Sequence, residues 1–168
     1  MESTGAGQLG PGMLAQAASE RERHWRWLES SYGGSAIHQT FGLTLTVAGD
    51  GEVVVHAEAT GAAANKAGTV GGGVLAQMVD SAAVQAARSR LDSQDRAVTV
   101  ELNVNFLRPA LAGGPLHASG SLLHLSRTLA VARAEVRDAH DVVVAVGLVT
   151  VRVLRARGAE AIAAPEPG

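Results

Sequence analysis

Residues 73–91 restrict the fold of this chain more than any other segment, because they predict one long helix with a very wide apolar surface. Its apolar side chains, spaced at the helical period, are Val74, Leu75, Met78, Val79, Ala82, Ala83, Ala86 and Ala87. Only a narrow stripe is polar, formed by Gln77, Asp80, Ser81 and Arg88. A helix of this kind must be largely wrapped by other structure, so the rest of the chain has to supply a cover.

That cover is predicted to be a β-sheet, because most other segments alternate apolar and polar residues. We expect strands at residues 37–47, 53–60, 97–106, 116–125, 129–137 and 142–154. Gly49, Asp50 and Gly51 predict a hairpin turn between the first two. In residues 97–106 the two faces separate cleanly, with Thr99, Glu101, Asn103 and Asn105 on the polar side and Val98, Val100, Leu102, Val104 and Phe106 on the apolar side.

The order of elements indicates an α+β fold. A first helix is predicted at residues 13–31, ending at Gly33 and Gly34, and two strands, the long helix and four more strands follow. Strands joined by short turns favour an antiparallel sheet, so we expect five or six strands wrapped around the central helix. Aromatic residues make up only 3% of the chain, so the core must consist of small and β-branched side chains that allow close packing.

The expected domain organisation is simple. Residues 1–35 form an N-terminal tail and helix, with residues 1–12 disordered, residues 36–156 form the folded domain, and residues 157–168 form a flexible C-terminal tail. The length of 168 residues suits one such domain.

Composition and charge argue against several classes of function. The net charge of −2 and the mixing of both signs argue against nucleic-acid binding. No apolar run is long enough to span a bilayer, and the first residues do not resemble a signal peptide, so a cytoplasmic protein is expected. The chain has no cysteine, which excludes disulfides, cysteine-ligated zinc and a cysteine nucleophile.

Common catalytic motifs are missing from the sequence. No G-x-S-x-G elbow is present, and the six histidines show no metal-binding spacing, so no metal site is expected. The glycines at 71–73 match neither a phosphate-binding P-loop nor the G-x-G-x-x-G pattern of dinucleotide-binding folds.

The segment from Asn65 to Asp80 is the best candidate for chemistry. Its glycines precede the long helix, so backbone N–H groups at a positive helix N-terminus can approach a ligand closely. Asp80 lies about two turns further along the same helix. Donors for an oxyanion together with a base or nucleophile are the minimum for acyl transfer. The pattern alone also fits a tight glycine loop followed by an ordinary exposed carboxylate.

The same segment resembles the PaaI-type thioesterases of the hotdog-fold superfamily. Members carry an Asn, then Gly-Thr, then His-Gly-Gly and an acid nine residues after the His. Here the matching positions are Asn65, Gly68, Thr69, Gly72, Gly73 and Asp80. The resemblance extends over residues 97–109 and 124–128 and covers about residues 36–156.

This resemblance implies a hotdog fold and hydrolysis of an acyl-CoA thioester to a carboxylic acid and coenzyme A. It implies a homodimer or dimer of dimers with active sites at the interface. Asp80 would act as general base or nucleophile, and the Gly72 N–H would polarise the thioester carbonyl. Asn65 would position water or the carbonyl, and Thr99, from either subunit, would orient water or the carboxylate.

The substrate-binding residues expected from the resemblance lie around the same helix and in one strand-connecting turn; they are Gly71, Gly73, Gln77, Ser81, Val84, Ser126 and Arg127. Arg88, Arg90 and Arg108 are further candidates for binding the phosphates of coenzyme A. No cofactor is expected, because coenzyme A belongs to the substrate.

The main departure from the family pattern is Gly71, which stands where the family usually has His. The absence of a His side chain at this position is expected to weaken binding of the thioester group. A glycine is also expected to loosen the backbone that presents the Gly72 N–H. The alternative function is therefore a non-catalytic protein that binds acyl-CoA or an acyl carrier protein. A hotdog dehydratase is a third hypothesis, but such enzymes usually place a His beside the acid.

Overall fold

The computed structural model describes residues 11–59 and 61–156. Of the residues 1–12 that were expected to be disordered, residues 1–10 lie outside the described part, as does the predicted tail at residues 157–168, whereas Pro11 and Gly12 begin the first helix. The elements in chain order are α1 (Pro11–Tyr32), α2 (Ala36–Thr40), β1 (Thr44–Gly49), β2 (Glu52–Glu58), a 3₁₀ turn η1 (Gly61–Ala63), α3 (Gly72–Arg88), β3 (Arg96–Phe106), β4 (Pro115–Leu125), β5 (Leu129–Arg137) and β6 (Val143–Leu154).

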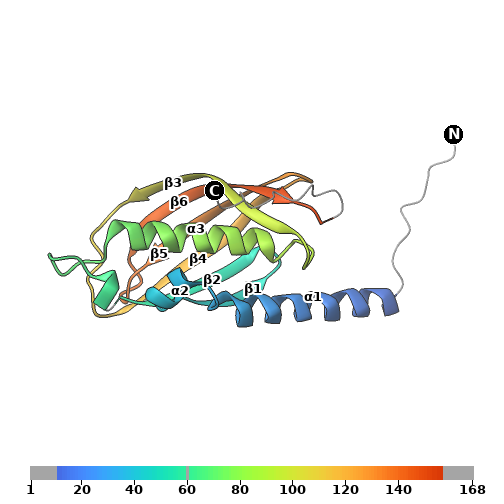
Figure 1. Cartoon of the computed structure of the whole chain (residues 1–168), viewed down its shortest axis with the longest axis horizontal. Helices are drawn as coiled ribbons and strands as arrows, with labels where there is room; N and C mark the ends of the chain where they lie inside the picture. Colours follow the sequence, from blue (N-terminus) through green and yellow to red (C-terminus); the bar gives the residue numbers. More distant parts are fainter. Residues whose placement is uncertain (1–10, 60, 157–168) are drawn as a thin grey trace, which may run out of the picture.

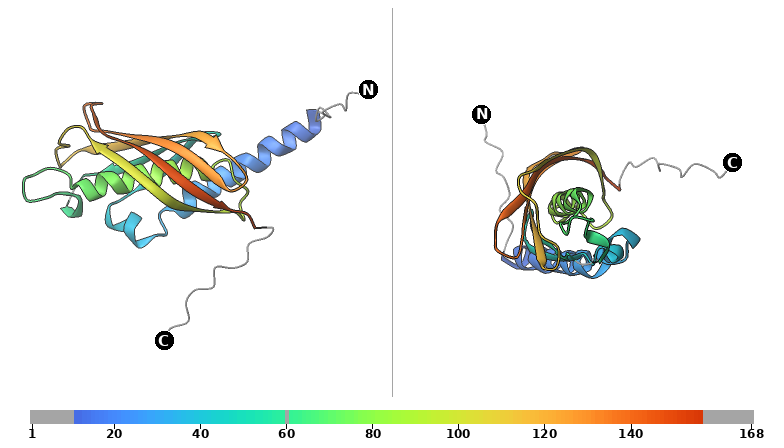
Figure 2. Two further views of the ribbon diagram at one scale, coloured as in Figure 1. Left: turned by 90° about the horizontal axis from the view of Figure 1, so that it is seen from above. Right: turned by 90° about the vertical axis from the view of Figure 1, so that its left-hand side faces the viewer.

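The six strands form one antiparallel sheet in the order β1-β2-β4-β5-β6-β3. Figures 1 and 2 show the sheet curling around α3, with α1 and α2 on the side that the sheet leaves uncovered. This arrangement confirms the predicted α+β hotdog fold with six strands. β1 and β3 are the two edges of the sheet, so β3 pairs with β6 on one side only.

The helix lies unusually close to the sheet at two glycines. A Cβ atom at Gly120 of β4 would collide with the backbone of Ala82, and one at Gly147 of β6 would collide with the Val79 side chain. Small side chains fill the rest of this contact, including Ala83, Ala86, Ala87, Ala118, Ala132, Ala134 and Ala145, all at most 1% exposed. The scarcity of aromatic residues therefore has a structural reason, since large side chains would push helix and sheet apart.

The chain around residues 36–43 differs from the prediction. A strand was expected from residue 37, but residues 36–40 form the short helix α2, and β1 begins at Thr44. Gly42 adopts a positive φ of 60°, and the Leu43 N–H donates to the His38 carbonyl, so the backbone turns here instead of extending. The long helices also differ slightly at their ends, since α1 begins at Pro11 and α3 ends at Arg88.

The clean alternation predicted for residues 97–106 is broken by a bulge in β3. The register with β6 pairs Thr99 with Val151 and Glu101 with Thr150, so Val100 is an extra residue. Val151 is fully buried against the helix, so Thr99 faces α3, whereas Val98 lies opposite Arg152 on the outer face. The prediction that Val98 shares a face with the later apolar residues of the strand is therefore wrong.

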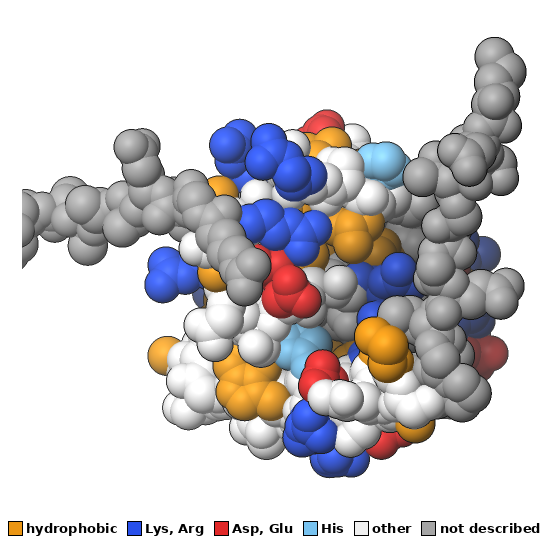
Figure 3. All heavy atoms as spheres, turned by 90° about the vertical axis from the view of Figure 1, so that its right-hand side faces the viewer, with side chains coloured by type: hydrophobic (Ala, Val, Ile, Leu, Met, Phe, Trp, Pro, Cys, Tyr) orange, Lys and Arg blue, Asp and Glu red, His pale blue; other side chains and the backbone are white. Residues whose placement is uncertain are grey.

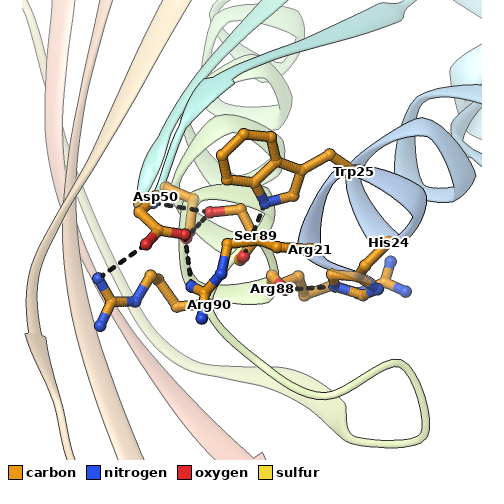
Figure 4. A network of polar contacts seen from close by, with 9 residues as sticks. Arg21, His24, Trp25, Asp50, Arg88, Ser89 and Arg90 are labelled. Carbon is orange, nitrogen blue, oxygen red and sulfur yellow. Dashed lines mark hydrogen bonds and ion pairs between the residues drawn. The ribbon is translucent and has the colours of Figure 1, made fainter. Parts of the chain in front are cut away.

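The N-terminal helix is anchored at the C-terminal end of α3 (Figure 4). The His24 ring contacts the Arg88 carbonyl oxygen at 2.9 Å, and the Trp25 indole N–H donates to the Ser89 carbonyl oxygen at 3.0 Å. These two side chains bond carbonyl groups at the helix end; the Arg88 carbonyl also accepts from the Leu91 N–H. None of the helices within residues 11–156 is long and apolar enough to cross a membrane.

Candidate active site

Asp80 lies on the half-buried side of α3. Ala76, Gln77, Val84 and Arg88 share this side and are likewise half-buried, while the rest of the helix after the exposed Gly72 and Gly73 is buried. These half-buried side chains form a stripe along α3 that runs between edge strand β3 and the N-terminal segment. It is the part of the central helix where a carboxylate can meet a substrate.

A single hydrogen bond fixes the Asp80 carboxylate. The Thr99 hydroxyl donates to Oδ1 of Asp80 at 2.6 Å. The bulge at Val100 makes this contact possible, because it places Thr99 on the helix-facing side of β3. The sequence left open which subunit would supply Thr99, and the structure shows that it can orient the carboxylate of its own chain.

On the other flank of Asp80, the N-terminal helix covers α3. Ser81 is only 5% exposed and accepts a hydrogen bond from the Gln77 amide at 3.0 Å. Tyr32 of α1 is equally buried; burial raises its pKa to about 12, an effect that the nearby Ser81 hydroxyl opposes and the Asp80 charge reinforces. Ser81, expected to bind substrate, is thus enclosed, while Gln77 stays partly accessible.

The N-terminus of α3 presents free backbone donors. Gly71 is the N-cap residue, with φ −63° and ψ 135°, and no side chain caps the helix. Within the described residues, the N–H groups of Gly72 and Gly73 have no hydrogen-bond acceptor, and both glycines are exposed. Unpaired N–H groups at a helix N-terminus attract a negatively charged oxygen, as a developing oxyanion requires.

An apolar cavity of about 310 Å³ adjoins the Gly72 donor. The Phe106 ring packs directly against Gly72, where a Cβ atom would lie 3.4 Å from it. Leu75, Leu107 and Arg108 also line the cavity. Apolar walls beside backbone donors and a cationic rim suit an acyl or thioester group better than a fully charged ligand. The sequence did not single out Phe106 as a site residue, since it looked like an ordinary strand position.

Asn65 organises the loop before the helix. Its Oδ1 accepts hydrogen bonds from the Ala67 and Thr69 N–H groups, and its amide donates to the Thr69 hydroxyl at 2.7 Å. Both polar ends of the side chain are therefore used inside the loop. In this conformation Asn65 shapes the approach to Gly71 and Gly72, and its expected contact with water or substrate stays a prediction.

The two central groups of the site are far apart within one chain. Eight residues separate Gly72 from Asp80 in one continuous helix, a distance of about 12 Å along its axis. A donor and a base that serve the same thioester must each lie within about 3 Å of the reacting carbonyl or its attacking water. The two groups of one chain are therefore not adjacent, and an axial spacing of about 12 Å is long for a donor and a base that act on the same carbonyl.

The remaining predicted residues lie elsewhere. Ser126 and Arg127 occupy the turn between β4 and β5, where the Ser126 hydroxyl bonds Leu129 and the Arg127 carbonyl accepts from Arg155. These contacts do not join them to Asp80 or Gly72. Their substrate-binding role stays a prediction.

Of the three further arginines, only Arg108 lies beside the Gly72 cavity. Arg90, together with Arg21 of α1, is paired with Asp50 (Figure 4). The Arg88 guanidinium lies over the Trp27 ring, 5.5 Å from its centre. On the uncovered part of that end of the molecule, basic and acidic side chains are mixed (Figure 3). This end is therefore not a surface of one charge.

Residues 67–145 match the family model described as "Thioesterase superfamily". A Halobacterium salinarum protein named as a candidate esterase is 38% identical over 96 residues, which cover 52% of this chain and 62% of that protein.

Two solved structures extend the comparison. A mutant of the phenylacetic acid degradation protein PaaI from Thermus thermophilus is 30% identical, with a TM-score of 0.63, over 70% of this chain and 98% of that one. A thioesterase from Haemophilus influenzae shares the fold, with a TM-score of 0.71 at 18% identity, over 78% of this chain and 90% of that one. The family-model match, together with 30% identity over nearly all of the Thermus thermophilus PaaI chain, shows that this chain belongs to the thioesterase superfamily.

Proposed function

We propose that this protein is an acyl-CoA thioesterase that hydrolyses its substrate to a carboxylic acid and free coenzyme A. The observation that carries the proposal is the pair of groups on α3, a carboxylate held by Thr99 and an unpaired N–H at Gly72. The carboxylate supplies the base or nucleophile, and the N–H stabilises the negative charge that develops on the carbonyl oxygen.

The proposed reaction proceeds at the thioester carbonyl carbon. Asp80 removes a proton from water as the water oxygen attacks this carbon, and the resulting oxyanion accepts a hydrogen bond from the Gly72 N–H. The C–S bond then breaks, and the thiolate of coenzyme A takes up the proton. In the nucleophilic variant Asp80 attacks the carbon itself, and water hydrolyses the resulting anhydride.

We further propose that two chains build each active site. The separation of about 12 Å between Gly72 and Asp80 supports this arrangement, because the Gly72 N–H of one chain would then face Asp80 of its partner. Edge strand β3 suits the contact, since its outer edge is unpaired in this chain and Val98, Val100 and Leu102 on it are 41–57% exposed. Pairing of β3 with its copy would cover these residues and create two equivalent sites.

The substrate would lie between the Gly72 N–H of one chain and the Asp80 carboxylate of its partner. Its thioester would meet Gly72 at the mouth of the apolar cavity, and Gly73, Gln77 and Val84 would contact it along the open side of the helix. Arg108 at the cavity rim is the candidate for holding a phosphate of coenzyme A, because it is a cation in the lining of the cavity that Gly72 also lines.

A second function has one specific observation in its favour. Gly71 provides no side chain where the family usually has His, so the protein could bind an acyl-CoA or acyl carrier protein without turning it over.

The experiment that separates the two functions measures binding and turnover independently. Hydrolysis of a panel of acyl-CoAs is followed by thiol release, with wild-type protein and with the Asp80→Ala and Asp80→Asn variants. The hydrolase predicts a loss of about 100-fold or more in kcat for both variants, with binding retained. Tight binding of acyl-CoA by wild type, with thiol release no faster than in Asp80→Ala, would establish the binding protein instead.

A further inference from the structure

Two histidines meet on the outer face of the sheet, away from the thioesterase site. His56 of β2 and His117 of β4 are directly opposite each other in the antiparallel register. Their chain neighbours Val55, Ala57, Leu116 and Ala118 are at most 6% exposed, so the buried face is the other one. The two Nδ1 atoms are 3.0 Å apart, and the rings are nearly perpendicular, at 82°.

The orientation of the His56 ring is fixed by a third residue. Its Nε2 lies 3.1 Å from the Thr46 hydroxyl on β1. When Nε2 carries the proton and donates to Thr46, the lone pair of Nδ1 points at His117. Metal-binding histidines in proteins are held in the same way, with one ring nitrogen bonded to a supporting group and the other free to coordinate.

We propose that His56 and His117 form a two-imidazole site for a divalent transition-metal ion of the Cu²⁺, Ni²⁺ or Zn²⁺ type. A bond length of about 2.05 Å to each nitrogen separates the two nitrogens by about 2.9 Å in a square-planar site and about 3.3 Å in a tetrahedral one. The observed 3.0 Å falls between these values, so the two nitrogens already have a chelating separation, and each ring turns to direct its lone pair at the ion instead of at the other nitrogen.

Proton balance allows the ion to enter. The hydrogen bond between the two Nδ1 atoms needs one proton, which His117 holds when Thr46 accepts from His56. Binding of the ion moves that proton to Nε2 of His117, and both Nδ1 lone pairs then face the metal.

The surrounding charges tolerate a cation. Arg137 of β5 lies opposite His117, but its guanidinium is paired with Glu135 and Asp141. Glu58, two residues after His56 on the same face of β2, adds a negative charge. Within the described residues no group of three or more His, Asp or Glu side chains is placed to bind an ion, so water would complete the coordination.

The site rests on strand pairing, which explains why residue spacing in the sequence did not reveal it. The two histidines are 61 positions apart in the sequence, a spacing that corresponds to no metal-binding motif. The two histidines lie on neighbouring strands of a rigid sheet, so the separation of their rings is already set before an ion binds.

The test uses tag-free protein, because a polyhistidine tag would itself bind the ions. Zn²⁺ alone and Cu²⁺ alone are titrated calorimetrically into wild type, His56→Asn, His117→Asn and the control His140→Asn, which changes an exposed histidine elsewhere. Circular dichroism establishes that each variant is folded. Electron paramagnetic resonance of the Cu²⁺ complex counts the coordinating nitrogens.

We expect one ion per chain in wild type and in His140→Asn, with affinity at least ten-fold weaker in either site variant. The Cu²⁺ spectrum should show two coordinating nitrogens in wild type and fewer in the site variants. Thr46→Val should weaken binding by a smaller factor, because it frees the His56 ring. Equal affinity in wild type and both site variants would overturn the proposal, as would the absence of binding to wild type.

Discussion

The Thr99 hydroxyl donates a 2.6 Å hydrogen bond to Oδ1 of Asp80, and so joins edge strand β3 to the central helix α3. The bond sets the direction of the carboxylate on the open side of the helix. Because β3 is also the strand proposed to meet a second chain, the same element would orient the acid and build the interface.

The Thr99→Val variant tests whether this bond matters for turnover. Valine keeps the size of the side chain but removes the donor, and a hydrogen bond to a charged group contributes about 1.5–3 kcal/mol. We expect kcat to fall by roughly ten-fold or more, with little change in KM. The matched control is Thr99→Ser, which keeps the hydroxyl and should keep most of the activity. Equal kcat values for the Val and Ser variants would rule out an orienting role for Thr99.

The Gly71→His variant tests the departure from the family pattern. The backbone there accepts any side chain, since φ is −63° and a Cβ atom would lie 3.8 Å or more from its nearest neighbours. We expect kcat/KM on acyl-CoA to rise by up to about ten-fold, the effect of one added hydrogen bond. Gly73→His places the same side chain two residues further on and should not help. A gain in both variants, or in neither, would show that position 71 does not limit the rate.

The sequence was sufficient for the architecture but not for the detail of the site. Periodicity located α3 and the later strands closely, because a wide apolar helix surface and strict alternation leave few other folds. Periodicity gave a wrong prediction from Ile37 onward. The apolar and polar residues alternate there as in a strand, but the chain forms a short helix followed by a turn at Gly42. Periodicity also failed at Val100, since nothing in a regular pattern marks the bulge that turns Thr99 toward Asp80. The bulge depends on pairing with β6, a tertiary contact that a local pattern does not contain, whereas the turn at Gly42 is local and is not marked by the alternation of apolar and polar residues.

Close packing of helix and sheet predicts a strong effect of Gly120→Ala. The added Cβ atom would collide with the Ala82 backbone, which cannot rotate away as a side chain would. We expect a loss of about 1–3 kcal/mol or more in the free energy of unfolding, measured with urea. Gly49→Ala is the control, because its Cβ atom would meet nothing within 4 Å. Similar losses in the two variants would mean that the close approach is not what Gly120 is needed for.

Acid should weaken the fold through Asp95. Burial alone would raise the pKa of this carboxyl, but hydrogen bonds from the Ala156 N–H, the Arg155 guanidinium and the Asp92 N–H together hold the pKa below its usual range. A depressed pKa stabilises the folded state above the unfolded-state value of about 3.9, and this contribution is lost as the pH falls further.

Urea unfolding of wild type and Asp95→Asn at pH 6, 4 and 3 measures this contribution. We expect the variant to be less stable at pH 6 and its stability to depend less on pH than that of wild type. Asp141→Asn alters a carboxylate that is 86% exposed and should follow the wild-type profile. If Asp95→Asn also keeps the wild-type pH dependence, the acid sensitivity arises elsewhere.

The central claim is that one active site takes Gly72 from one chain and Asp80 from the other, and subunit mixing tests it most directly. Asp80→Ala removes the carboxylate, and Gly72→Pro removes the N–H. Proline suits this first helical position, because Gly71 before it is already extended. Each variant alone should be nearly inactive. After equal mixing and subunit exchange, half of the dimers would be mixed, and each would hold one intact site. The account predicts about one quarter of wild-type activity. Activity that stays at the level of the separate variants, although mixed dimers have formed, would contradict it.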